Sequence, residues 1–296
     1  MSAFAADKPT LRHGYVDNRY GQLHYALAAP AGGAASKTPL VMFHQSPNSS
    51  IEFDSLTEEL GSDRVVYALD TPGHGGSNGP AEVATIEQLA DAMHEALLNL
   101  GFGPARPFDG FGFHTGTRLL SVLAARHPKM VRRVMMGLSG VSVVPAAESA
   151  ALLAAVYHPT SAEDAFTRFC ARMPKSLASS KAAGIPDLVW GKLAAGQLRG
   201  LTRYEFGHAA AFEFGNRFVD NLKKMTQPVS FIVVEDGMKA SGAAKKSARE
   251  MSEEVVGMMT ASKKAKVEPE TFELKDLHLN AKGMANVIRR FQDEPS

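Results

Sequence analysis

The sequence predicts an α/β fold with a mostly parallel, doubly wound sheet and a helical cap inserted into it. Short apolar runs at residues 39–43 and 64–69 are typical of strands that are buried on both faces of a parallel sheet, and further strands of the series are expected at 107–111 and 131–138. Segments with helical spacing lie between these runs, and this alternation favours right-handed crossovers. From residue 141 to about 227 the pattern changes to helical pieces broken by prolines.

The remaining elements follow from the same periodicities. Residues 14–28 alternate apolar and polar side chains around Asn18 and Gly21, which predicts an antiparallel hairpin at one edge of the sheet. Thr85 is placed to cap a helix over residues 85–100. We further expect strands at 229–234 and 271–274, and helices at 51–60, 115–126, 243–261 and 281–291.

Composition limits the class of protein. A chain of 296 residues with 45% hydrophobic and 21% charged residues can form one elaborated domain. The formal net charge is +1 and the basic residues are dispersed, so nucleic acid and membrane surfaces are excluded as expected partners. Cys170 is the only cysteine, which excludes an internal disulfide. A small-molecule substrate, no cofactor and a cytoplasmic location are expected, and a homodimer is left open.

The proline-rich middle segment divides the predicted domain. Residues 1–140 and 228–296 form the core in this prediction, and residues 141–227 form the cap. Aromatic residues concentrate in the cap segment, where Tyr157, Trp190 and Phe212 are expected to enclose an apolar or aromatic substrate.

The elbow, residues 112–116, joins a predicted strand to a predicted helix. Gly112 and Gly116 have the spacing of the G-x-S-x-G turn, in which small residues let the backbone turn sharply and expose the central side chain. The central residue here is His114 instead of serine. The sequence therefore indicates the architecture more clearly than the reaction.

Four stretches together resemble the α/β-hydrolase fold. They are the elbow, residues 44–47 (His-Gln-Ser-Pro), residues 70–77, which match D-x-P-G-x-G-x-S, and residues 276–278 (Asp-Leu-His). The match covers nearly the whole chain outside the cap. The versions with His-Gln-Ser-Pro and with histidine at the elbow resemble a recurring subgroup of that superfamily.

The resemblance implies roles for individual residues. His278 lies where the general base of the family lies, and Asp236 is the expected acid, with Glu235 as the alternative. The backbone N–H groups of Gln45 and Thr115 map to the oxyanion hole, and Ser46 is a less favoured donor. His44 and Ser46 are expected to line the substrate pocket.

His114 leaves three roles open. A neutral imidazole can attack a carbonyl as a nucleophile, or remove a proton from water as a general base. It can also be an inactivating replacement. We expect hydrolysis of an ester, lactone or carbon–carbon bond in a small carbonyl compound.

Three alternatives use the same residues. A lyase or oxygenase without a cofactor could use His114 or His278 as its base. A metal site could be formed by His114, His278 and Asp236, with His44 as a further ligand. A binding module without catalysis is the third alternative, since fold alone does not decide function.

Overall fold

A computed structural model describes residues 9–32, 36–138, 161–201, 206–215, 217–235, 246–262 and 264–295. Eight strands form one sheet in the order β1-β2-β4-β3-β5-β6-β7-β8. β2 is antiparallel to β1 and β4, and the other neighbours are parallel. The strands are β1 (Arg12–Asn18), β2 (Gly21–Ala28), β3 (Leu40–Phe43), β4 (Val66–Leu69), β5 (Phe108–Phe113), β6 (Val131–Leu138), β7 (Val229–Glu235) and β8 (Ala265–Glu273). The predicted fold class is confirmed.

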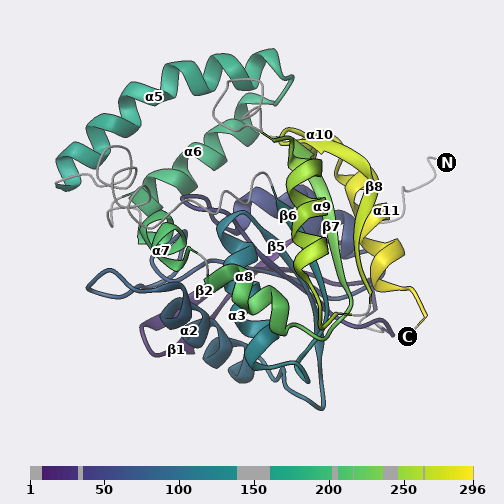
Figure 1. Cartoon of the computed structure of the whole chain (residues 1–296). Coiled ribbons are helices and arrows are strands. Elements are labelled where there is room, and N and C mark those ends of the chain that lie inside the picture. The colour runs from purple at the N-terminus through teal and green to yellow at the C-terminus, as the bar shows by residue number, and fades with distance from the viewer. Residues whose placement is uncertain are drawn as a thin grey trace.

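Helices pack against both faces of the sheet (Figure 1). On one face lie α2 (Ile86–Asn99), α3 (Thr115–Arg126), α8 (Arg217–Lys224) and α9 (Ala248–Met258). On the other lie α1 (Asp54–Leu60), α10 (Asp276–Leu279) and α11 (Ala281–Gln292). A short 3-10 helix, η1 (Ser50–Phe53), precedes α1. No helix of the described residues is long and apolar enough to cross a membrane.

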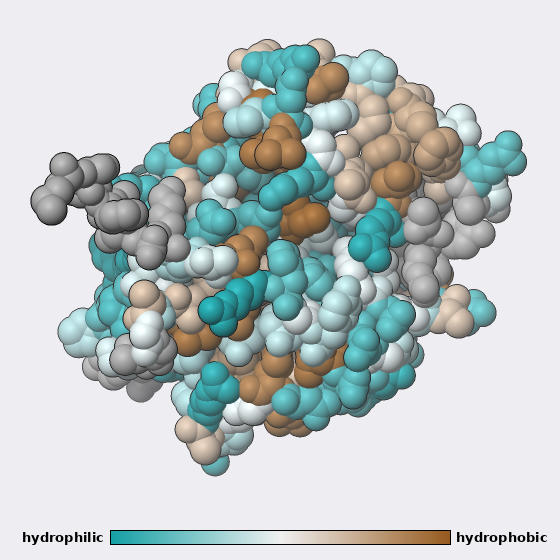
Figure 2. All heavy atoms as spheres, turned by 180° about the vertical axis from the view of Figure 1, so that it is seen from behind, coloured by the Kyte–Doolittle hydropathy of each residue, from teal (hydrophilic) through white to brown (hydrophobic). Residues whose placement is uncertain are grey.

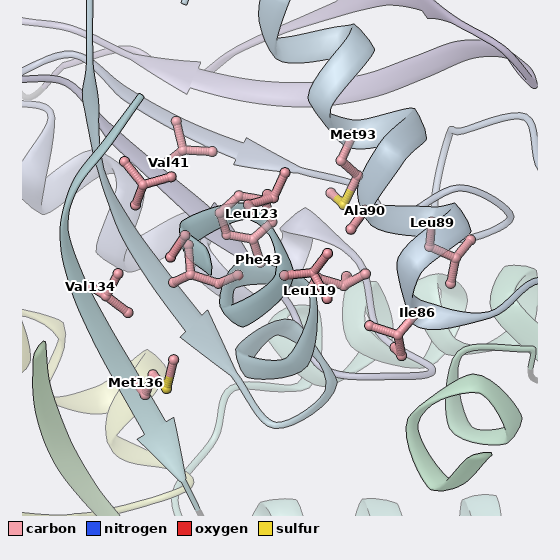
Figure 3. Packing of buried hydrophobic residues seen from close by; sticks show 14 of the residues in the cluster. Val41, Phe43, Ile86, Leu89, Ala90, Met93, Leu119, Leu123, Val134 and Met136 are labelled. Atoms are coloured by element: carbon pink, nitrogen blue, oxygen red, sulfur yellow. The ribbon is translucent and has the colours of Figure 1, made fainter. Parts of the chain in front are cut away.

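Alternating side chains of the strands fill two cores. In β3, Val41 and Phe43 contribute to the core under α2 and α3, whereas Leu40 and Met42 contribute to the core under α1 and α11. Figure 3 shows Phe43 beside Leu119 and Leu123 of α3. This packing fixes the amino end of α3 over the sheet.

The predicted hairpin is observed as β1 and β2, and the strand predicted at 131–138 is β6. The helix cap predicted at Thr85 is confirmed, and it forms a capping box in which Gln88 N donates to Thr85 Oγ1 and Thr85 N to the Gln88 side chain. β8 is longer than the predicted strand at 271–274. Its first part carries alternating charges and a proline, which suit an edge strand but do not resemble a buried one.

Part of the predicted cap is described. α5 (Ala162–Ala182) and α6 (Asp187–Leu201) pack on each other above the sheet (Figure 1). α7 (Phe206–Phe214) and α8 instead pack against α3, so they belong to the same layer as that helix. The boundary predicted between core and cap stays a prediction.

The surface mixes polar and apolar residues. Seen from behind, hydrophilic residues lie between scattered hydrophobic ones (Figure 2). The cap helices contribute to the apolar part, because Phe166 of α5 is 53% exposed and Leu188 of α6 is 75% exposed.

Glycines let α6 and α7 approach the loop that follows β3. A Cβ at Gly200 of α6 would lie 2.6 Å from the Pro47 carbonyl oxygen, and one at Gly207 of α7 would overlap Ser46 Oγ. A Cβ at Gly196 would lie 2.9 Å from Ser49 Oγ. The two helices are therefore seated directly on that loop.

We expect Gly200→Ala to lower the free energy of unfolding by about 1–3 kcal/mol, because the new methyl group meets a backbone atom that cannot easily move. Gly191→Ala is the matched control in the same helix, since a Cβ at Gly191 has nothing within 4 Å. That control should be stabilised by roughly 0.5–1 kcal/mol. Urea unfolding of both variants measures this, and equal effects would contradict the close seating of α6.

Candidate active site

The elbow has strained backbone geometry at its central residue. His114 adopts φ 46° and ψ −111°, and it is the only residue other than glycine with positive φ in the described part of the chain. A Cβ at Gly116 would overlap the Phe43 carbonyl, and one at Gly112 would lie 2.6 Å from the Gly116 carbonyl oxygen. The elbow is thus a tight strand-to-helix turn, as its glycine spacing predicts.

The strained backbone of His114 is held on both sides. Its N–H donates to the Gly137 carbonyl of β6 at 3.2 Å. Its carbonyl accepts from Thr117 N at 3.0 Å and from Thr117 Oγ1 at 2.6 Å. The imidazole lies edge-on to the Phe113 ring, with 4.8 Å between ring centroids. β6 and α3 therefore fix this residue in its conformation.

A cavity of 770 Å³ lies between the cap helices α5 and α6 and the segments that follow β3, β7 and β8. His278, Gln45 and Trp190 line it, as the sequence predicts for a substrate site. The other described lining residues are Asn48, Glu52, Ser176, Ser179, Ser180, Ala183, Ile185, Leu193, Ala194, Gln197, Glu235, Thr271, Phe272, Glu273, Leu274, Lys275 and Asp276.

Other predicted site residues lie elsewhere. The described lining of this cavity does not include the remaining five, which are His44, Ser46, His114, Thr115 and Phe212. Asp236 and Tyr157 lie outside the described residues. Their predicted roles stay predictions.

His278 lies in α10, a single helical turn that packs against η1. Burial lowers the pKa of His278, so its imidazole is neutral at neutral pH and can accept a proton. Glu235 lines the same cavity, but no hydrogen bond joins it to His278 in the described structure. No hydrogen bond between described residues joins His278 to His114 either.

Glu52 is a site residue that the sequence did not indicate. It is 2% exposed, and it lines the cavity at the end formed by the loop after β3. Glu52 Oε2 accepts from Gln45 N at 3.1 Å, while Oε1 accepts from Asn48 Nδ2 at 2.8 Å and from Gln45 Nε2. An acidic residue at the start of a helix is normally exposed to solvent and stabilises the helix dipole. The sequence therefore does not indicate that Glu52 is buried in this site.

This network bears on the predicted oxyanion hole. The N–H of Gln45 already donates to Glu52. It can donate to a substrate only if this hydrogen bond is shared with the substrate or broken. The Ser46 N–H donates to Thr115 Oγ1 at 3.4 Å, at the first residue of α3, so it too already has an acceptor. The Thr115 N–H belongs to the first residue of α3, where a helix supplies no intrahelical acceptor.

His44 and His74 join two loops. Thr71 N donates to His44 Nε2 at 2.9 Å, so Nδ1 carries the proton and donates to the Gln45 carbonyl at 2.7 Å. Burial lowers the pKa of His44 and, together with the adjacent His44, lowers that of His74 to about 3. Both rings are neutral and buried, and they support the loop after β3 from below.

Asp70 anchors the loop that matches D-x-P-G-x-G-x-S. Its carboxylate accepts from Ser50 N at 2.6 Å, Gly76 N at 2.7 Å and His24 Nδ1 at 2.8 Å. Burial opposes ionisation of Asp70, but these donors hold its pKa below the usual value. The loop is therefore tied to β2 and to η1.

The metal-site alternative has no support among the described side chains, where no three His, Cys, Asp or Glu residues converge as ligands. Its proposed ligand Asp236 lies outside the described residues.

Comparison with solved structures identifies the architecture. An enol-lactonase from Burkholderia xenovorans LB400 matches with a TM-score of 0.69 and 16% identity, over 95% of this chain and 100% of that one. MGS-M2, an alpha/beta hydrolase enzyme from a Medee basin deep-sea metagenome library, matches with a TM-score of 0.70 and 12% identity, over 96% and 98%. The chain has the α/β-hydrolase fold.

A thermophilic esterase from Thermogutta terrifontis shares this α/β-hydrolase fold, with a TM-score of 0.63 and 16% identity over 95% of this chain and 98% of that one. No protein-family model matches the chain, and no curated protein matches it in sequence. The subgroup with histidine at the elbow stays a prediction.

The buried Glu52 carboxyl predicts a pH effect on stability. Burial raises its pKa to about 7, so the folded protein binds this proton more tightly than the unfolded chain, where the pKa is 4.5. The stabilising contribution is complete below pH 4.5 and is lost as pH rises to about 7.

Glu52→Gln removes this titration. Between pH 4.5 and 7 the unfolding free energy of the wild type should therefore fall by roughly 3 kcal/mol relative to the variant. Urea unfolding of both proteins across this pH range measures the difference. A constant difference would contradict a raised pKa for Glu52.

Proposed function

We propose that the protein is a hydrolase that cleaves an ester, lactone or carbon–carbon bond in a small carbonyl compound, with His114 as the nucleophile. The observation that carries this proposal is the elbow, whose strained backbone presents an imidazole where the first N–H groups of α3 are also free of intrahelical acceptors. Backbone N–H donors stabilise the charge that develops on a carbonyl oxygen, and they do so whichever side chain occupies the elbow.

For an ester, the first step forms a bond between a ring nitrogen of His114 and the carbonyl carbon. The carbonyl oxygen becomes an oxyanion, and its proposed donors are the Thr115 N–H and the Ser46 N–H, which would exchange its bond to Thr115 Oγ1 for one to the substrate. The carbon–oxygen bond then breaks, the leaving oxygen takes up the proton that the acylated imidazole releases, and an acyl-imidazole remains.

The second step is hydrolysis of the acyl-imidazole. Water attacks the acyl carbon while neutral His278 accepts its proton, and the bond to His114 breaks as the proton passes to the departing imidazole nitrogen. The lowered pKa of His278 suits this role, because a protonated imidazole could not act as base.

The triad acid is proposed at Asp236, with Glu235 as the alternative. Glu235 ends β7 and lines the cavity together with His278. The ester and lactone bonds of this proposal are also those implied by the printed names of an esterase and an enol-lactonase with this fold. The apolar wall of the cavity, with Trp190, Leu193 and Ile185, supports a substrate with an apolar or aromatic part.

We expect His114→Ala and His278→Ala each to lower the turnover of an activated aryl ester at least about 100-fold, because each removes a group that bonds to the substrate or moves a proton. His94→Ala in α2 is the control, since His94 stacks on His127 away from the elbow. Initial rates at pH 7 check this, with circular dichroism to verify folding. Wild-type turnover in His114→Ala would reject His114 as the nucleophile.

A further inference from the structure

One end of the cavity wall contains a buried hydrogen-bond acceptor that has no donor among the described residues. Asn48 is 7% exposed and lines the cavity. Its Nδ2 donates to Glu52 Oε1 at 2.8 Å, whereas its Oδ1 is buried and accepts no hydrogen bond. A buried acceptor without a donor is unfavourable, so a ligand that donates a hydrogen bond to this oxygen would be stabilised.

Glu52, which binds Asn48, also lacks a cation. Its three hydrogen bonds come from neutral amides of Gln45 and Asn48, and no Lys, Arg or His of the described residues forms an ion pair with it. A carboxylate offers about four acceptor positions, so one remains open. A buried carboxylate without a cationic partner is costly, and a bound cation would offset that cost.

The rest of the cavity wall has an excess of negative charge. Glu273 forms an ion pair with Lys275 at 2.9 Å. Lys275 is the only lysine among the described lining residues. The Glu235 carboxyl group has no hydrogen bond or ion pair with a described residue, whereas the Asp276 carboxylate accepts the backbone N–H of Glu273 and interacts electrostatically with Lys275. Two carboxyl groups, of Glu52 and Glu235, therefore line the cavity without a described cation.

We propose that this cavity binds a substrate that carries a protonated amino group, with its N–H donors on Asn48 Oδ1 and Glu52 and its apolar part along Trp190. An ammonium group offers three donors and a positive charge, which match an open amide oxygen and an open carboxylate. Trp190 Nε1 donates to Ser176 Oγ at 3.1 Å, which fixes the indole in the wall. A neutral hydroxyl would supply one donor and leave the carboxylates unneutralised.

The identification of this ligand as the substrate rests on the proposed function, whereas its binding does not. Isothermal titration calorimetry with benzylammonium, benzyl alcohol and benzoate at pH 7.5 measures binding with no turnover, and these three ligands share the aromatic ring. We expect benzylammonium to bind at least about tenfold more tightly than benzyl alcohol, and benzoate most weakly.

Variants assign the binding to this end of the cavity. Glu52→Gln and Asn48→Leu should each weaken benzylammonium at least about fivefold and change benzyl alcohol less than about twofold. Glu235→Gln, at a partly exposed position, gives a second test if the buried variants do not fold, and should weaken benzylammonium at least about twofold. Glu253→Gln in α9, exposed and outside the cavity, is the control.

Equal binding of benzylammonium and benzyl alcohol, a preference for benzoate, or no binding of benzylammonium would overturn the proposal. So would selective binding that stays unchanged in every folded cavity variant. If benzylammonium binds as expected but aryl esters are not cleaved, the cation site stands and only the proposed hydrolysis fails. If esters are cleaved but benzylammonium does not bind selectively, only the cation site fails.

Discussion

The close approach of α3 to the end of β3 is the constraint on which the site depends. Gly116 has no room for a Cβ beside the Phe43 carbonyl, and Gly112 has little room beside the Gly116 carbonyl. This approach forces the chain to turn within one residue, and His114 takes the strained backbone conformation. The same approach brings the Ser46 N–H next to Thr115, so the turn and the donor groups have one cause.

The loop after β3 connects this turn to the cavity and to the cap. His44 fixes the loop to Thr71 from below, and Gly200 and Gly207 let the cap-side helices rest on it from above. The Glu52 carboxylate stabilises the same loop, because it accepts hydrogen bonds from the Gln45 N–H and from the Asn48 side chain. A ligand that changes the charge or the hydrogen bonds of Glu52 would therefore act on the loop that is expected to bind the oxyanion, which links substrate recognition to the reaction.

Elements with a clear periodicity could be predicted from the sequence. The strand at 40–43 is apolar on both faces, and the helix after Thr85 has both a cap and an apolar stripe. The elbow was predictable because the two glycines mark positions where the turn leaves no room for a side chain. β8 is longer than predicted because Lys266 and Glu270 lie at a sheet edge, where charges are tolerated, and the buried Glu268 is paired with Lys266 and Arg290.

The polar part of the site was less predictable, because it depends on contacts between loops. Glu52 lies one turn before an ordinary amphipathic helix, and only the fold buries it against Gln45 and Asn48. Gln45 illustrates the same limit, since sequence position suggested a free N–H and the structure gives that N–H an acceptor. His278 could be predicted as a site residue because it follows the last predicted strand, where the general base of the α/β-hydrolase fold lies. It does line the cavity.

Mass spectrometry of the intact protein after brief incubation with an activated aryl ester tests most directly whether His114 is the nucleophile. An acyl-imidazole intermediate predicts an added mass of one acyl group in the wild type, mapped to His114, and no such addition in His114→Ala. Rapid turnover by both proteins, with no acyl addition to the wild type, would contradict nucleophilic attack by His114.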